Sequence, residues 1–234
     1  MSQPEWFLWG VLPYMIVVFV VSALIWRYVT NPFSWTSKSS ELLEKRMLKW
    51  GSLLFHYGII AVFFGHVAGL LVPVSVYHTL GISDEAYHIG ALAGGLPAGV
   101  ITLIGVLILL YRRLTVIRIR ATSSVGDRVA IVVLALVILT GVLATSGNAL
   151  SHTEFDYRTT INPWLRGLMV LQPDPELMST VPIGFKIHMM TSFALYLVFP
   201  FTRLVHVFSL PIGYLRRSYV LYRRRDGSIR SNRN

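Results

Sequence analysis

The sequence predicts an all-α integral membrane protein in which five membrane-spanning helices form one bundle. Hydrophobic residues make up 54% of the 234 positions and charged residues only 14%, whereas globular domains carry about 25% charged residues. The mean hydropathy is +0.59. The uncharged residues are also gathered into long stretches, and a helix needs roughly 20 consecutive apolar residues to cross a lipid bilayer.

Five such stretches follow one another along the chain. Four contain no Asp, Glu, Lys or Arg, and the fifth continues as an apolar run past Arg203. Turn and cap residues such as Asn31-Pro32 and Pro182 mark their ends. No basic residue precedes the first stretch, so it lacks the positive start of a cleaved signal peptide and we retain it as a span. The expected spans are 7–28, 50–72, 88–111, 129–148 and 185–209.

The positive charges predict how these spans are oriented. Of the 21 Lys and Arg residues, 18 fall in segments 27–49, 112–128 and 203–234, on one side of the membrane. The opposite side holds Arg158, Arg166 and Lys186. Because basic residues are retained on the cytoplasmic side, we expect the N-terminus outside and the C-terminus in the cytoplasm.

The whole chain, 1–234, is expected to be one membrane domain that ends in a basic cytoplasmic tail, 210–234. The formal net charge of +10 would suggest nucleic acid binding in a soluble protein. Here the topology accounts for most of the surplus, so the lipid bilayer, and no nucleic acid, is the expected partner.

The longest connection between spans, 148–181, is expected on the outer side. Asn162-Pro163 and Asp174-Pro175 each resemble a helix start, with a polar cap followed by proline in the first turn. Two short surface helices are therefore predicted there.

The chain contains no cysteine. This excludes disulfides, iron–sulfur clusters, thiolate or covalent haem attachment and cysteine-based zinc sites within the chain. Histidine is the remaining candidate ligand. Ionisable residues inside a bilayer are costly and usually functional, and four of the seven histidines fall within spans: His56, His66, His188 and His206.

These four histidines predict two haem groups. His56 and His66 lie in the second span, and His188 and His206 lie in the fifth, which runs in the opposite direction. A haem iron with two neutral imidazole ligands needs one histidine from each of two facing helices. Antiparallel order pairs His56 with His206 near the cytoplasm and His66 with His188 near the outside. The alternative is a set of polar side chains that line a path through a haem-free bundle.

In ideal straight helices, the two histidines of each pair would not both lie at matching depths in the membrane. The 10 residues between His56 and His66 rise about 15 Å, whereas the 18 residues between His188 and His206 rise about 27 Å. A bend at Pro200 would absorb part of the difference.

Other residues near these histidines suit a porphyrin. Lys186 and Arg203 lie close to candidate ligands and either pair with haem propionates or simply reach the membrane interface. Gly51, Gly58 and Gly65 recur every seven residues on the second span, which provides a bare stripe either for a flat macrocycle or for close packing of helices.

His88 lies at the outer start of the third span, where a quinol would approach from the membrane. A histidine there is able to take a proton from a hydroquinone during its oxidation; the alternative is a polar residue at a helix end. His78 and His152 are expected to be surface residues of the outer loops.

Several blocks of the sequence also carry a family resemblance. They include SSELLEKRMLKWGSLLFHYGIIAVFFGHVAGLLVP, HIGALAGGLPAG, FDYRTT with NPWLRG, and FKIHMMTSFALYLVFPFTRLVHVFSLPIGYL. The chain resembles the cytochrome b gamma subunit of respiratory membrane-bound nitrate reductase over nearly its whole length. The most specific parts are the spacing of His56 and His66 and the block PFTRLVHVFSLP.

The resemblance implies a bundle with two b haems, in which His56 and His206 hold the inner haem and His66 and His188 the outer one. It also implies that a quinol, menaquinol or ubiquinol, is oxidised near Gly65, His66 and the start of the third span. Some family members have lysine where this chain has His88.

Further implications concern partners and place. Electrons would pass to an iron–sulfur beta subunit and a molybdenum-containing alpha subunit on the cytoplasmic side, in anaerobic nitrate respiration at a bacterial or archaeal cell membrane. The chain would thus be the quinol-oxidising subunit of a quinol:nitrate oxidoreductase. Two alternatives stay open: the cytochrome b anchor of another quinone-linked complex, and a haem-free transporter.

Overall fold

The computed structural model describes residues 3–31, 34–35, 40–151 and 155–208. All regular secondary structure in these ranges is helical, as predicted. Five helical stretches in these ranges are long and apolar enough to cross a membrane, in agreement with the expected five: Gln3–Thr30, Arg46–Leu71, Asp84–Thr115, Val125–Leu150 and Ile183–Phe201. The fold is that of a multi-pass membrane protein. The predicted tail, 210–234, lies outside the described residues.

The elements follow the chain order. The first span joins α1 (Gln3–Trp6), a π-helical turn (Phe7–Val11) and α2 (Leu12–Thr30), and the second joins α3 (Arg46–His66) and a π-helical turn (Val67–Leu71). The remaining α-helices are α4 (Val74–Thr79), α5 (Asp84–Thr115), α6 (Ile117–Thr122), α7 (Val125–Leu150), α8 (Ile161–Met169) and α9 (Ile183–Val198). Each of the first four spans begins four residues before its predicted start, and all but the second, which ends at Leu71, also end later than predicted.

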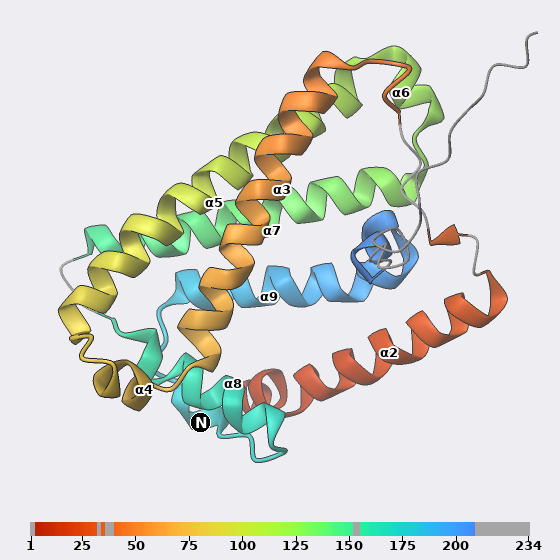
Figure 1. Ribbon diagram of the computed structural model, residues 1–234. Coiled ribbons are helices and arrows are strands. Elements are labelled where there is room, and N and C mark those ends of the chain that lie inside the picture. The colour runs from red at the N-terminus through yellow and green to blue at the C-terminus, as the bar shows by residue number, and fades with distance from the viewer. Residues whose placement is uncertain (1–2, 32–33, 36–39, 152–154, 209–234) are drawn as a thin grey trace, which may run out of the picture.

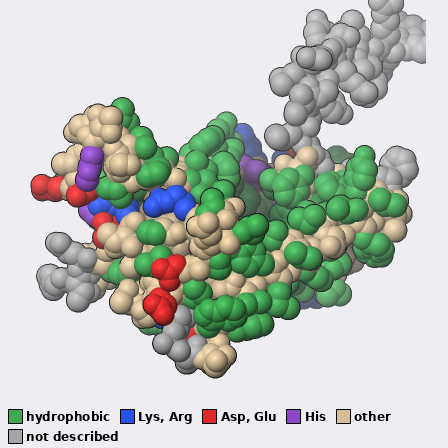
Figure 2. Space-filling view, turned by 90° about the horizontal axis from the view of Figure 1, so that it is seen from below, with side chains coloured by type: hydrophobic (Ala, Val, Ile, Leu, Met, Phe, Trp, Pro, Cys, Tyr) green, Lys and Arg blue, Asp and Glu red, His purple; other side chains and the backbone are tan. Residues whose placement is uncertain are grey.

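Figure 1 shows how the spans are arranged. Helices α3 and α5 cross near α6 and diverge toward α4 and α8, α7 packs against both α5 and α9, and α2 lies along the far side of α9. We refer to the two ends of the bundle as the α8 end and the α6 end. Seen from below the view of Figure 1, charged and histidine side chains gather toward the left, where α4 lies, while hydrophobic side chains cover much of the remaining surface (Figure 2).

Buried arginine fixes the start of α3 to the end of α5. Arg112 is 3% exposed, and its Nε donates to Glu44 Oε2 at 2.7 Å. Its other nitrogens donate to Ser40 Oγ and to the main-chain oxygens of Ser40 and Glu44. Glu44 in turn accepts from the main-chain N–H of Met47 in the first turn of α3. The α3–α5 pair is thereby closed at the α6 end.

The connection between α7 and α9 holds two short helices, as predicted, but one face of α8 is buried against the bundle. Helix α8 is preceded by Thr160 rather than capped by Asn162, and Asn162 is fully buried. Asn162 Nδ2 donates to Gly69 O at 2.6 Å, and Trp164 Nε1 donates to Trp9 O at 2.8 Å. Each acceptor belongs to a π-helical turn of another span, where the regular helical pattern is interrupted. Helix α8 therefore completes the hydrogen bonding of two spans.

The second start signal in this connection is confirmed. Asp174 precedes a short 3₁₀-helix, Pro175–Met178, and its side chain accepts from the main-chain N–H of Glu176. Met178 is fully buried, however, because it packs into the same cluster as α8.

The fifth span differs from the predicted continuous helix over 185–209. Helix α9 ends at Val198, a 3₁₀-turn covers Phe199–Phe201, Thr202 is extended, and a second 3₁₀-helix covers Arg203–Phe208. Proline has no N–H to donate and its ring clashes with the preceding turn, so Pro200 breaks the helix rather than bending it. His206 consequently lies on a separate short helix.

Candidate functional site

The structure brings one predicted pair of histidines together. His66 is the last residue of α3 and His188 lies in α9, and their ring centroids are 6.4 Å apart with an interplanar angle of 50°. A metal ion bound at about 2.0 Å by each of two imidazoles holds the ring centres roughly 6 Å apart. The spacing of His66 and His188 therefore fits two axial ligands of one haem iron.

All four span histidines share one hydrogen-bonding pattern. In each ring Nδ1 lies close to a main-chain oxygen, and because a carbonyl only accepts, Nδ1 carries the hydrogen. Nε2 then keeps its lone pair, which is the form that a metal ligand needs. The distances are 2.7 Å from His56 to Ser52 O, 2.8 Å from His66 to Val62 O, 3.1 Å from His188 to Val137 O and 2.6 Å from His206 to Arg203 O.

Helix α7 makes room for His188. A Cβ atom placed on Gly141 would lie 2.9 Å from His188 Cε1, so a side chain at this position would collide with the imidazole. The neighbouring Thr140 Oγ1 lies 3.3 Å from His188 Nδ1. Sequence reasoning missed Gly141, although an isolated glycine in the middle of an apolar span is a signal of close approach.

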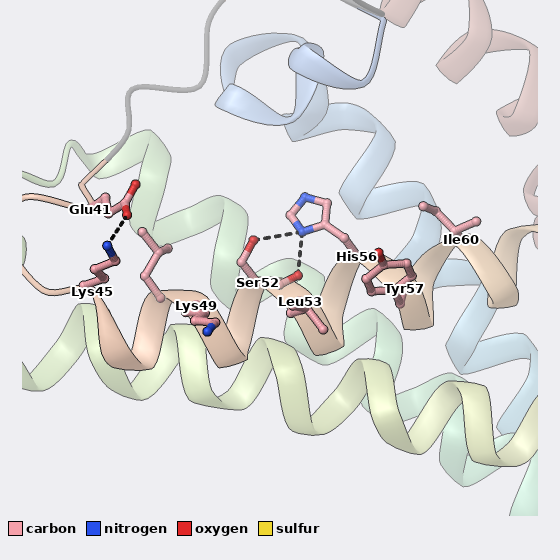
Figure 3. Close-up of a pocket in the computed structure, with 9 residues that line it drawn as sticks. Glu41, Lys45, Lys49, Ser52, Leu53, His56, Tyr57 and Ile60 are labelled. Atoms are coloured by element: carbon pink, nitrogen blue, oxygen red, sulfur yellow. Dashed lines mark hydrogen bonds and ion pairs between the residues drawn. The ribbon is translucent and has the colours of Figure 1, made fainter.

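His56 and His206 have different surroundings. The described contacts of His56 are with Ser52 and Phe55 of its own helix, and those of His206 are with Arg203. His56 points away from α5 into an open pocket of about 610 Å³ (Figure 3). Its lining residues are Glu41, Lys45, Leu48, Lys49, Ser52, Leu53, His56, Tyr57 and Ile60.

The glycines of the α3 stripe lie in two different kinds of surroundings. A Cβ on Gly58 would lie 2.9 Å from the main-chain nitrogen of Thr102, and one on Gly51 would lie 3.0 Å from the side chain of Leu109. Both contacts are with α5, so for these two positions the macrocycle interpretation was wrong and close helix packing is correct. A Cβ on Gly65 would meet no atom of the described part of the chain within 4 Å.

Lys186 and Arg203, the two residues predicted to pair with haem propionates, differ in their contacts with the protein. Lys186 lies half-buried in the first turn of α9, two residues before His188. Arg203 Nε donates to Asp127 Oδ1 at 2.6 Å, and the Asp127 side chain is only 3% exposed. Arg203 therefore has a protein partner at the start of α7, and its role toward a propionate stays a prediction.

His88 belongs to a charged cluster at the α8 end. Arg158 is 4% exposed and donates to Asp84 Oδ1 at 3.0 Å, to Asp156 Oδ2 at 2.8 Å and to His88 Nε2 at 3.1 Å. His88 Nε2 also lies 3.7 Å from Asp156 Oδ2. Sequence reasoning missed Arg158, although the signal was present, because it is one of three basic residues expected on the outer side.

The groups of this cluster stabilise one another's protonation states. Burial alone would raise the pKa of Asp156, but hydrogen bonds from the side chain and N–H of Arg158 outweigh it and hold that pKa below its ordinary value. Burial and the hydrogen bond with Tyr87 raise the pKa of Tyr157, so this phenol stays protonated. His78 is exposed, as expected, and pairs with Asp84 at 3.1 Å. His152 lies outside the described residues.

Comparison with known proteins identifies the family. Residues 5–225 match the model of the family described as nitrate reductase gamma subunit. The chain belongs to this family. It is 49% identical over 219 residues to the nitrate reductase gamma chain of Bacillus subtilis, an alignment that covers 94% of this chain and 98% of that one.

Two more distant relatives extend the comparison. The respiratory nitrate reductase 2 gamma chain of Escherichia coli is 34% identical over 221 residues, which cover 94% of this chain and 96% of that one. The nitrate reductase-like protein NarX of Mycobacterium tuberculosis is 42% identical over 219 residues, which are 34% of its own length. The chain is therefore a gamma subunit of a nitrate reductase complex and part of an oxidoreductase.

Proposed function

We propose that this chain is a dihaem b-type membrane subunit that oxidises quinol near its outer face and passes the electrons to an iron–sulfur subunit of a nitrate reductase. His66 and His188 would hold the outer haem, and His56 and His206 the inner one. The α8 end would face outward and the α6 end the cytoplasm, in keeping with the distribution of basic residues.

One observation carries the proposal. His66 and His188 come from two different spans, their ring centres are 6.4 Å apart, and each Nδ1 is occupied by a main-chain carbonyl. This arrangement fixes the orientation of both rings before any metal binds. A haem held by His66 and His188 would supply a one-electron carrier at this position.

The surrounding residues suit quinol oxidation at the α8 end. A quinol releases two protons with its two electrons, so the site needs a group that accepts a proton. We assign this role to His88: protonation at Nε2 gives an imidazolium that Asp156, 3.7 Å away, stabilises. Arg158 would give up its bond to His88 and keep those to Asp84 and Asp156.

Gly65 lies directly before His66, and among the described residues no atom lies within 4 Å of the position where its Cβ would stand. We propose that the quinol, menaquinol or ubiquinol, reaches the outer haem over this bare surface. Lys186, in the first turn of α9, is placed to pair with a propionate of the same haem. Arg203 would do the same at the inner haem.

Membership of the family supports a proposal about partners. The relatives are gamma chains of nitrate reductases, and this chain has no cysteine with which to hold an iron–sulfur cluster. We infer that an iron–sulfur beta subunit and a molybdenum-containing alpha subunit bind at the basic α6 end and reduce nitrate there.

Replacement of the outer ligands tests the proposal. We expect His66→Ala and His188→Ala each to remove one of two haems and to abolish quinol oxidation, because a single imidazole leaves one axial position open. The measurement is a pyridine haemochrome assay with an optical redox titration of the purified complex. His78→Ala is the matched control, since this exposed histidine of the same end pairs only with Asp84 among the described residues. Retention of both haem signals by either ligand variant would contradict the assignment.

A further inference from the structure

We propose that Arg27, in the last turn of α2, is a positioning residue for the inner haem ligand His206. Its guanidinium lies at the break in the fifth span and donates to main-chain oxygens there. The inference rests on the proposed function, since it presumes that His206 holds a haem. It concerns a residue outside the candidate site, on a helix that carries none of the four histidines.

The break in the fifth span exposes main-chain oxygens that need hydrogen-bond donors, and Arg27 supplies them. Helix α9 stops at Val198, and Thr202 adopts an extended conformation before the next 3₁₀-helix. Main-chain oxygens at such a break have no helical donor, and in an apolar bundle each unsatisfied one is costly. Thr202 is 4% exposed, so water does not reach this point.

Arg27 joins two segments that are far apart in the sequence. Its Nη1 donates to Pro200 O at 2.5 Å and to Thr202 O at 2.7 Å. On its other side, Nη2 donates to Ser34 O at 2.9 Å and Nε donates to Ser34 Oγ at 3.0 Å. The planar fork of arginine suits this geometry, because its donors point in fixed and divergent directions.

Hydrogen bonds at neighbouring residues link Arg27 to His206 through the main chain. Thr202, whose carbonyl accepts from Arg27, also accepts at Oγ1 from the main-chain N–H of Leu204 at 3.3 Å, which caps the 3₁₀-helix of His206. Within that helix, Arg203 O lies 2.6 Å from His206 Nδ1. The carbonyl that sets the tautomer and the direction of the imidazole is thus one residue from the carbonyl held by Arg27.

Asp127 supports the same helix from the start of α7. It receives Arg203 Nε at 2.6 Å, and its own position is fixed by the capping box with Ser124 at the start of α7. With this contact present, loss of Arg27 would free one side of the 3₁₀-helix and leave the other attached. We therefore expect a change in the orientation and affinity of the inner ligand rather than loss of the fold.

The experiment compares Arg27→Gln and Arg27→Lys in the assembled membrane complex. The readouts are the haem content, the midpoint potential of each haem and the low-spin ferric EPR signal, whose g values depend on the orientation of the axial imidazoles. We expect Arg27→Gln to lower the affinity for the inner haem about tenfold and to shift its EPR signal, while the outer haem is unchanged. Lysine keeps the charge but not the fork, so Arg27→Lys should restore only part of the affinity.

Two controls make each outcome decisive. Arg118→Gln removes an exposed arginine at the same end and should change neither haem. Should Arg27→Gln fail to assemble, Ser34→Ala removes one of the acceptors of Arg27 and should shift the same inner signal to a smaller extent.

An inner haem that is unaltered in Arg27→Gln, or equal changes at both haems, would overturn the inference. Failure of the proposed function looks different: the unmodified complex would then lack two haems, or His206→Ala would retain both.

Discussion

The two ends of α3 differ in what surrounds them, although the same glycine spacing runs through both. Toward the α6 end, Gly51 and Gly58 are buried against α5, where there is no room for even a Cβ atom. Toward the α8 end, Gly65 is exposed, and no residue that the structure describes lies within 4 Å of its Cβ position. The difference arises because α3 and α5 cross near α6 and diverge toward α8 (Figure 1).

The comparison explains where the candidate ligands lie. His56 and His66 are both exposed, whereas the glycines that pack against α5 are buried. Helix α3 therefore uses one face to hold α5 and another to present imidazoles. At the α8 end the described residues leave the Cβ position of Gly65 free, so that the space beside His66 is open to a ligand.

The largest effect is expected at the packed end. In Gly58→Ala the new methyl group would lie 2.9 Å from the Thr102 nitrogen and 3.0 Å from its Cα, so the two helices must move apart. We expect a loss of about 2 kcal/mol in the free energy of unfolding, since overpacking outweighs the gain in helix propensity. Thermal unfolding in detergent measures this loss. If α3 tolerated alanine at Gly58 without a change in stability, the contrast between its two ends would fail.

The sequence predicts the features of the fold that depend on local residues, and it does not predict those that depend on partners far away in the chain. The five spans are predicted because stretches without charge are a property of the local sequence. The break at Thr202 and the burial of α8 are not, because both depend on partners distant in the sequence. Arg27 satisfies the carbonyls of the break across 175 positions, and Asn162 reaches Gly69 across 93.

The candidate site shows the same limit. Antiparallel order alone selects His66 and His188 as partners, and the structure brings these two rings together. The Nδ1 of His66 is directed to Val62 O, four residues earlier on its own helix, whereas the Nδ1 of His188 is directed to Val137 O on α7, a contact that no local residue pattern reveals. Gly141 and Arg158 escaped prediction for a related reason: their importance lies in what they approach, His188 in one case and a pair of carboxylates in the other.

An intermediate effect is expected where α7 approaches His188. In Gly141→Ala the methyl group would lie 2.9 Å from Cε1 and 3.2 Å from Nδ1 of the imidazole, which has to tilt or shift. Because a side chain yields more easily than a backbone, we expect a loss of about 1 kcal/mol in stability together with an altered EPR signal of the outer haem alone.

The matched control for this variant is Gly147→Ala on the same helix, where nothing lies within 4 Å of the new methyl group. It should preserve both haem signals. An unchanged outer haem in Gly141→Ala would show that α7 does not set the position of this ligand.

The smallest structural effect is expected at Gly65, at the open end of α3. Alanine there meets no atom within 4 Å, and its helix propensity exceeds that of glycine by about 1 kcal/mol. Thermal unfolding should therefore show equal or slightly greater stability, with both haems retained. If quinol passes over this surface, the methyl group should also raise the KM for quinol, while electron transfer from an artificial donor should be unchanged. Gly94→Ala, which is also unobstructed but lies on α5, serves as the control. A destabilisation as large as that of Gly58→Ala would mean that Gly65 is covered in the assembled complex, and quinol would then have to reach the outer haem by another route.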